Sequence, residues 1–220
     1  FDKIRADAIK HKPKMILAGY TSYPRDMDYA AFKSIADEVG AITMTDASHF
    51  GGLVAGGAMR NPFDDGFDIV TTTTHKSLRG PRGGMILCKK EFAKKIDKSV
   101  FPGLQGGPHM NAVAAIAITL LKAQTDEFKQ YAEQVLKNSK TLARVLMDRQ
   151  ASLVTGGTDN HMMVVNTDIS YGLDGRVAEE TLDKASITTN KQIIPDDPNP
   201  PLRPSGIRIG TPAATARGMV

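Results

Sequence analysis

The sequence lacks the features that indicate export, membrane insertion or a disulfide framework. It contains one cysteine, Cys88, so no internal disulfide can form, and such sparse cysteine is typical of a reducing compartment. The longest apolar run, residues 112–121, falls short of the ~20 residues that cross a bilayer. Charged residues begin at the second position, and no apolar signal region follows. We therefore expect a cytoplasmic protein.

Motifs for nucleotide or nucleic-acid binding are also missing. No Gly-to-Gly-Lys spacing stands before a Ser or Thr, which excludes a P-loop. The net charge of +4 raises the question of nucleic acid, and lysines cluster at positions 89, 90, 94, 95 and 98. Their spacing fits the solvated face of an amphipathic helix, without aromatic-rich strands, zinc-ligand spacing or a recognition-helix pattern. We expect neither a nucleic-acid partner nor a membrane, and a mildly basic surface suits anionic substrates.

What the chain does contain is a succession of short apolar runs separated by helix-sized segments. Residues 28–39 carry apolar positions on one face, with Asp26 or Asp28 as the N-cap and Gly40 as the C-cap, and residues 1–11 also look helical. Strands are predicted at residues 15–19 (buried), 42–45 (ending at Asp46), 68–74 and 84–88. This alternation predicts the α/β class, with a mostly parallel sheet covered on both faces.

The second part of the chain has a different organisation. After the break at residues 105–108, residues 111–148 are nearly free of glycine and proline, which predicts one or two helices. Beyond them we expect strands at 162–166 and 207–210, a helix around 176–184 and a proline-rich loop at 195–204. This is the pattern of a smaller α+β unit. The predicted division lies between residues 1–124 and residues 125–220.

The most informative segment is residues 71–84, TTTTHKSLRGPRGG. A β-branched strand gives way there to a polar, glycine-containing turn that holds Lys76. In open α/β sheets, ligands bind outside the carboxyl ends of the strands, so this amine stands where a Schiff-base lysine would be useful. A threonine-rich strand followed by an exposed lysine would explain the segment equally well if it stood alone.

Asp46 is the second candidate, at the end of the preceding strand. A carboxylate in that place can pair with a protonated pyridine nitrogen and keep the ring an electron sink. An aspartate after a strand is more often a cap or turn residue. The pairing of Asp46 with Lys76, each at the end of a neighbouring βα unit, strengthens the cofactor interpretation.

Three blocks of sequence, in order, resemble one family of enzymes. Residues 70–84 are similar to the cofactor-lysine signature of serine hydroxymethyltransferases, and residues 101–108 (FPGLQGGP) and 205–213 (SGIRIGTPA) resemble two further blocks of that family. The resemblance extends over essentially all 220 residues. It implies a fold-type-I pyridoxal 5'-phosphate enzyme with a large α/β domain and a smaller C-terminal domain. It also implies reversible transfer of the serine hydroxymethyl group to tetrahydrofolate, leaving glycine.

The resemblance assigns the first site residues around the cofactor ring. Lys76 matches the lysine that forms the Schiff base, and Asp46 matches the partner of the pyridine nitrogen. His49 and Thr21 match residues near the ring hydroxyl, although the family usually has Ser where Thr21 stands. His49 could equally be a hydrogen-bonded core histidine.

Further matches concern the phosphate and the substrate. His75 matches a phosphate-side ligand, and Thr73 matches a threonine packed close to the lysine. Gly106 and Gly107 match a turn that reaches the cofactor phosphate of the neighbouring subunit, which implies at least a homodimer. Paired glycines do let backbone N–H groups approach a phosphate, although a plain turn is the usual reason for them.

Arg208 matches the arginine that grips the substrate carboxylate. An arginine fork binds such a carboxylate bidentately and so fixes the Cα bond that is to be broken. The residue stands within an apolar strand, where an unpaired charge is expensive, so a buried structural ion pair is the alternative. Residues 190–192 align with a region near the folate site.

Two kinds of departure from the family pattern stand out. The family usually has Ala where Ser48 stands and Ser where Pro24 stands, and the stretch from Asp46 to Lys76 is one residue longer than in many relatives. The first portion of the family's sequence and the end of its small domain have no counterpart here, so we expect a fragment that is catalytically incompetent by itself.

Two alternative functions are another fold-type-I enzyme, such as a threonine aldolase or aminotransferase, or a non-catalytic nucleic-acid-binding fragment.

Overall fold

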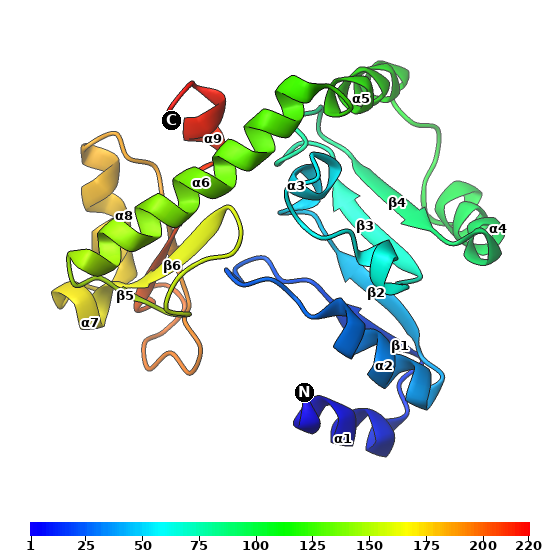
Figure 1. Ribbon diagram of the computed structural model, residues 1–220, viewed down its shortest axis with the longest axis horizontal. Coiled ribbons are helices and arrows are strands. Elements are labelled where there is room, and N and C mark those ends of the chain that lie inside the picture. The colour runs from blue at the N-terminus through cyan, green and yellow to red at the C-terminus, as the bar shows by residue number, and fades with distance from the viewer. The chain divides into compact units, whose positions relative to one another are not determined.

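The computed structural model describes residues 1–220, which form two compact units (Figure 1). The first consists of Phe1–Thr21 and Met27–Ala132, and the second of Ser22–Asp26 and Glu133–Val220. The division thus falls within a long helix, α6 (Asp126–Asp148), whereas the sequence placed it between residues 124 and 125. A short segment before α2 also joins the second unit, which no local pattern signals.

The first unit is built on a four-stranded sheet with the order β1-β2-β3-β4. The strands are β1 (Met15–Ala18), β2 (Ile42–Asp46), β3 (Ile69–Thr73) and β4 (Gly84–Cys88). The first three are parallel to one another, and β4 runs antiparallel to β3. The predicted α/β class with a mostly parallel sheet is confirmed.

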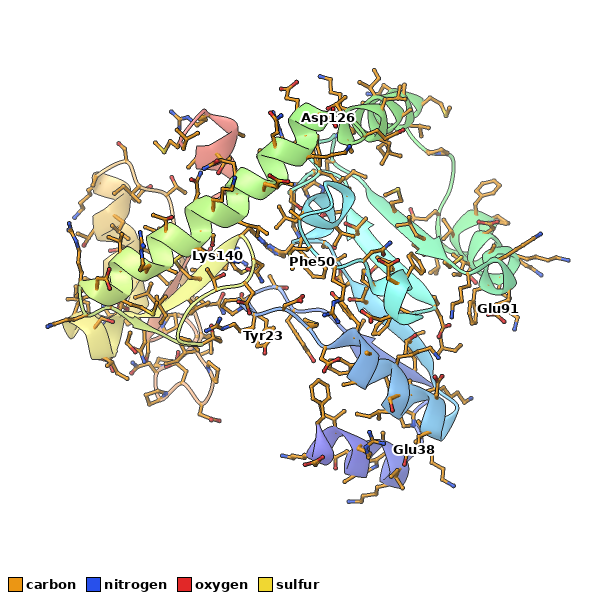
Figure 2. The ribbon with its side chains drawn as sticks, viewed as in Figure 1. Tyr23, Glu38, Phe50, Glu91, Asp126 and Lys140 are labelled. Atoms are coloured by element: carbon orange, nitrogen blue, oxygen red, sulfur yellow. The ribbon has the colours of Figure 1, made fainter.

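Helices of this unit come before, between and after the strands in the sequence. They are α1 (Asp2–His11), α2 (Tyr29–Val39), α3 (Gly51–Ala55), the 3₁₀ turn η1 (Pro62–Asp65), α4 (Lys90–Lys98), the irregular η2 (Ser99–Leu104), α5 (Met110–Ala123) and the start of α6. Helix α2 begins where Asp28 accepts a hydrogen bond from the Ala31 amide at 2.9 Å and ends at the left-handed Gly40, as predicted. Arg5 of α1 forms an ion pair with Glu38, near the end of α2. Glu38 is labelled in Figure 2.

The core of this unit packs α2 against the sheet, but the sheet is buried less than its sequence suggests. Tyr29 and Phe67 meet edge to face with ring centroids 5.1 Å apart. Strand β1 was predicted to be buried, yet Met15 is 43% and Leu17 51% exposed. Because alternate residues of a strand point to opposite faces, these two side chains share one face of β1, and that face is exposed within this unit.

The second unit holds a separate sheet with the order β5-β6-β8-β7, antiparallel throughout. Its strands are β5 (Ser152–Leu153), β6 (Met162–Asn166), β7 (Asn190–Gln192) and β8 (Gly206–Gly210). The rest of α6 and helices α7 (Thr167–Tyr171), α8 (Gly175–Lys184) and α9 (Pro212–Ala216) complete the unit (Figure 1). Met163, Val165 and Ile207 form the centre of its core. This is the smaller α+β unit that the sequence predicted.

The predicted proline-rich loop before β8 is organised by one carboxylate. Asp197 accepts hydrogen bonds from the amides of Ile194 and Asn199, and from the amide and hydroxyl of Ser205 at 3.0 and 2.7 Å. Partial burial raises the pKa of Asp197, but these donors outweigh it and lower the pKa to about 2. The loop is therefore fixed to the start of β8.

No helix of the chain combines the length and the apolar character needed to span a membrane.

A partly buried ionic cluster joins β2, β3 and β4 at the end of the sheet where β2 and β3 begin. The Asp68 carboxylate accepts from the Thr43 amide and hydroxyl at 2.9 Å each and from Lys89 Nζ at 2.6 Å. Burial raises the pKa of Asp68, but Lys89 and Thr43 more than compensate, so the pKa lies below its usual value. A carboxylate whose pKa is lowered in the folded state stabilises the fold at pH values above its pKa in the unfolded state. This stabilisation is lost as the pH falls through the pKa of the folded state.

We predict that Asp68→Asn lowers the free energy of unfolding at pH 7 by about 1–3 kcal/mol, since a hydrogen bond to a charged group is lost. The variant should also lose less stability than the wild type when the pH falls below about 4. Urea unfolding at a series of pH values measures both effects. Asp64→Asn is the control, because Asp64 is exposed. Equal effects of the two substitutions would contradict the role of the cluster.

Candidate functional site

A small cavity lies at the edge of the first sheet where the parallel strands β1 and β2 end. Its volume is about 90 Å³, and the residues that line it are Gly19, Tyr20, Thr21, Asp46, Ser48, His49 and Lys76. The parallel register brings Ala18 beside Thr45 and Asp46 beside Thr71, so the segments that follow these strands meet at the same edge. Four residues predicted from the sequence, Lys76, Asp46, His49 and Thr21, therefore lie around one cavity.

Lys76 stands on a tight turn after β3. The Arg79 amide donates to the Lys76 carbonyl at 2.9 Å, and the Gly80 amide donates to the Thr74 carbonyl at 2.8 Å, which closes the neck of the turn. The buried Ser77 hydroxyl accepts from the Gly52 amide at 2.9 Å and so fixes the turn to α3. The Lys76 side chain itself is exposed and makes no hydrogen bond or ion pair within the chain. Its backbone is held while its amine is available.

The other side of this turn is fixed by an aromatic contact. Arg79 adopts a left-handed backbone conformation, with φ of 62°, and its guanidinium lies over the Tyr131 ring, 4.7 Å from the centroid. Burial raises the pKa of the Tyr131 hydroxyl, and the charge of Arg79 opposes the rise. The cation–π contact offsets part of the cost of the unfavourable backbone conformation.

Asp46 ends β2 with its carboxylate exposed. Its Oδ1 accepts two hydrogen bonds from Ser48, from the amide at 2.9 Å and from the hydroxyl at 2.5 Å. This is the turn-residue role that the sequence offered as the alternative reading of Asp46. It leaves Oδ2 without a hydrogen bond from the protein, so the turn role and a ligand-binding role are compatible.

Thr73 and His75 flank the lysine without lining the cavity. The Thr73 hydroxyl donates to the Ser48 carbonyl at 3.1 Å, which connects β3 with the segment after β2. His75 Nδ1 accepts from the Gly83 amide at 3.4 Å, and Arg82 lies 3.5 Å from Nε2. The imidazole therefore belongs to the turn that carries Lys76.

Gly106 and Gly107 lie in a different groove of the same unit. That groove has a volume of about 1000 Å³ and is lined mainly by β4, η2 and the segment that leads to α5. A Cβ at either glycine would meet no atom within 4 Å, so packing within this chain does not require glycine there. These two predicted residues are not brought to the Lys76 cavity of their own chain.

Arg208 belongs to the second unit, on β8. Its Nε donates to Asn190 Oδ1 on the paired strand β7 at 3.2 Å, and Asn190 and Arg208 are direct partners in the strand register. The guanidinium is half-buried, and this desolvation lowers its pKa. A neutral amide on the neighbouring strand thus helps to orient the arginine.

Three residues of the cavity were not among the sequence candidates: Gly19, Tyr20 and Ser48. Gly19 has a signal, since a glycine within a predicted strand often marks a close approach of another backbone segment. A Cβ on Gly19 would stand 2.5 Å from the Asp46 carbonyl oxygen, and its φ is +121°. Tyr20 and Ser48 carry no such signal in a single sequence. No group of His, Cys, Asp and Glu side chains suited to hold a metal ion is found in the structure.

We predict that Gly19→Ala destabilises the protein by at least about 2 kcal/mol, because overpacking against the Asp46 backbone adds to the strain of a positive φ. Gly57→Ala is the matched control: its φ is +72°, but a Cβ there meets nothing within 4 Å. It should cost only about 1 kcal/mol, the backbone strain alone. Urea unfolding of the two variants measures the difference, and equal losses would contradict the close approach of Gly19 to Asp46.

Comparison with known proteins agrees with the resemblance of the three sequence blocks. The model of the serine hydroxymethyltransferase family matches residues 1–220. A curated serine hydroxymethyltransferase from Desulfotalea psychrophila is 53% identical over 218 residues, which are 99% of this chain and 51% of that protein. The chain thus spans about half the length of the curated relative it matches. A match along the whole chain at this level of identity shows that the chain belongs to the serine hydroxymethyltransferase family.

Proposed function

We propose that the protein containing this chain interconverts serine and glycine and transfers the hydroxymethyl group to tetrahydrofolate, with pyridoxal 5'-phosphate held covalently by Lys76. The observation that carries the proposal is the cavity at the carboxyl end of β2. An unpaired amine and a carboxylate with one uncommitted oxygen line it together, beside an imidazole and a threonine. Membership of the serine hydroxymethyltransferase family supports this choice of cofactor and substrates.

The residues around the cavity fit the cofactor chemically. When bound, pyridoxal phosphate supplies an electron sink for negative charge that develops at the substrate Cα. Asp46 would hold a proton on the ring nitrogen through its carboxylate, and His49 and Thr21 would lie near the ring hydroxyl. Gly19 supports the fit, since its missing side chain lets the segment after β1 pass against the Asp46 backbone. The turn around Lys76 would keep the amine at a fixed approach.

The phosphate would be held by residues from two chains. His75 lies on the lysine turn and would face the phosphate, with Thr73 close to the lysine. Gly106 and Gly107 line a separate groove and have open space around them. Their amides could therefore approach a phosphate that is not bound in the Lys76 cavity of the same chain. We infer that they complete the site of a neighbouring subunit and that the protein is at least a homodimer, acting in the cytoplasm.

Arg208 would bind the carboxylate of serine or glycine. A guanidinium remains charged even when burial lowers its pKa, and its planar fork binds a carboxylate in two parallel hydrogen bonds. The contact with Asn190 restricts rotation of the guanidinium before a substrate arrives. Such a grip fixes which bond of the Cα stands over the cofactor ring.

Reductive trapping tests the role of Lys76 directly. The full-length protein is reconstituted with pyridoxal phosphate, reduced with borohydride and mapped by mass spectrometry. We expect the label on Lys76, its loss in Lys76→Arg and its retention in Lys94→Arg, a substitution on the exposed face of α4. Cleavage of serine should depend on tetrahydrofolate, which separates this activity from that of an aldolase or aminotransferase. A label on another lysine would refute the proposal.

Substitution of Arg208 tests the substrate grip. We predict that Arg208→Lys raises the KM for serine about 10- to 100-fold, because a bidentate charged contact is replaced by a single ammonium. Arg203→Lys is the control: Arg203 is exposed and lies 3.7 Å from Asp174, an ion pair of little energetic weight. Steady-state kinetics with varied serine measure both. An unchanged KM in Arg208→Lys would exclude Arg208 from substrate binding.

A further inference from the structure

Ser48 contacts the Asp46 carboxylate more closely than any other residue of the cavity. Its amide and its hydroxyl both donate to the same oxygen, Oδ1, at 2.9 and 2.5 Å. Any residue except proline could donate the hydrogen bond from the backbone amide at this position. The hydrogen bond from the side chain requires a hydroxyl, as in serine or threonine. The serine side chain therefore adds a contact that an alanine could not make.

The position of Ser48 is itself fixed by β3. The Thr73 hydroxyl donates to the Ser48 carbonyl at 3.1 Å, and the Ala47 amide donates to the Thr71 carbonyl at 2.8 Å. The backbone of residues 47–48 is thus held on the strand that leads to Lys76. Ser48 connects this held backbone with the carboxylate of Asp46.

The consequence is a defined orientation of an otherwise exposed carboxylate. An exposed aspartate samples several side-chain rotamers, and two donors on one oxygen favour a single one. With Oδ1 occupied by Ser48, Oδ2 is the oxygen that remains to accept a hydrogen bond from a ligand. Without the hydroxyl, the amide alone would hold Oδ1, and the carboxylate would turn more freely.

We propose that Ser48 is a positioning residue that fixes the Asp46 carboxylate through its hydroxyl, so that Oδ2 is presented to the ring nitrogen of the cofactor. This inference rests on the proposed function, since it presupposes that Asp46 faces that nitrogen. Replacing Ser48 by alanine would remove the hydroxyl contact and keep the amide contact. It acts on the electron sink rather than on substrate affinity.

The test compares four variants of the full-length holoenzyme, and one of them, Asp46→Asn, replaces the carboxylate that Ser48 contacts. Ser48→Ala removes the hydroxyl, Ser48→Thr keeps it, and Ser34→Ala makes the same replacement at an exposed position of α2. The protein is reconstituted with cofactor labelled with ¹⁵N in the ring, and ¹⁵N NMR reports the protonation of that nitrogen. Kinetics with serine separate kcat from KM, and thermal unfolding of each variant reports its fold.

We expect Ser48→Ala to move the ring-nitrogen signal away from that of the wild type. The variant should also lower kcat about three- to tenfold. Loss of a fully buried hydrogen bond to a charged group would lower kcat further, but Asp46 is exposed. The KM for serine should change less than twofold, and Ser48→Thr should restore the wild-type signal. Ser34→Ala should match the wild type in every measurement.

The outcomes separate this inference from the proposed function. A Ser48→Ala enzyme with unchanged ring-nitrogen signal and kcat would overturn the positioning role, and so would a loss of activity explained fully by unfolding. If Asp46→Asn also leaves the ring-nitrogen signal of the wild type unchanged, the assignment of Asp46 fails, and the proposed site fails with it. A changed signal in Asp46→Asn alone would keep the proposed function and remove only Ser48.

Discussion

The parallel hydrogen bonding of β2 with β3 is the constraint on which the candidate site depends. It sets Asp46 beside Thr71, so the residues after both strands emerge at one edge of the sheet. From there the chain places a carboxylate after β2 and an amine after β3 around the same cavity. A shift of the register by one residue would turn these side chains to opposite faces. The ionic cluster of Asp68, Thr43 and Lys89 secures the same strands at their other end.

Rigid backbone and available side chains coexist around this cavity. The turn of Lys76 is held by its own backbone bonds, by Ser77 on α3 and by the contact of Arg79 with Tyr131. Asp46 is held at one oxygen by Ser48 and open at the other. Chemistry at a site requires side chains that are positioned before a ligand binds, since each rotation left free must be frozen at the moment of binding. The first unit supplies that preorganisation for Asp46 and for the lysine turn.

Much of the fold was predictable because local signals were strong and agreed with one another. Asp28 and Gly40 bracket α2, the β-branched run before Lys76 forms β3, and the long stretch without glycine or proline forms α5 and α6. The exposure of Met15 and Leu17 was not predictable, since an apolar run reads the same whether or not another element covers it. The junction of the two units within α6 has no local signal either, because the sequence pattern of the helix continues unchanged across it.

The sequence by itself determined the family, and it predicted the candidate site residues: a lysine on a polar turn, an aspartate after a strand, and an arginine in an apolar strand. The lysine and the aspartate follow from residue types and spacing, and the role of the arginine follows from the resemblance to the family. The tertiary structure decided which of them share a cavity, that Gly106 and Gly107 line a separate groove, and that Gly19, Tyr20 and Ser48 join the site. These residues follow different strands, and they become neighbours only because the strands pair. The local sequence around one residue does not show which strand will pair with its own.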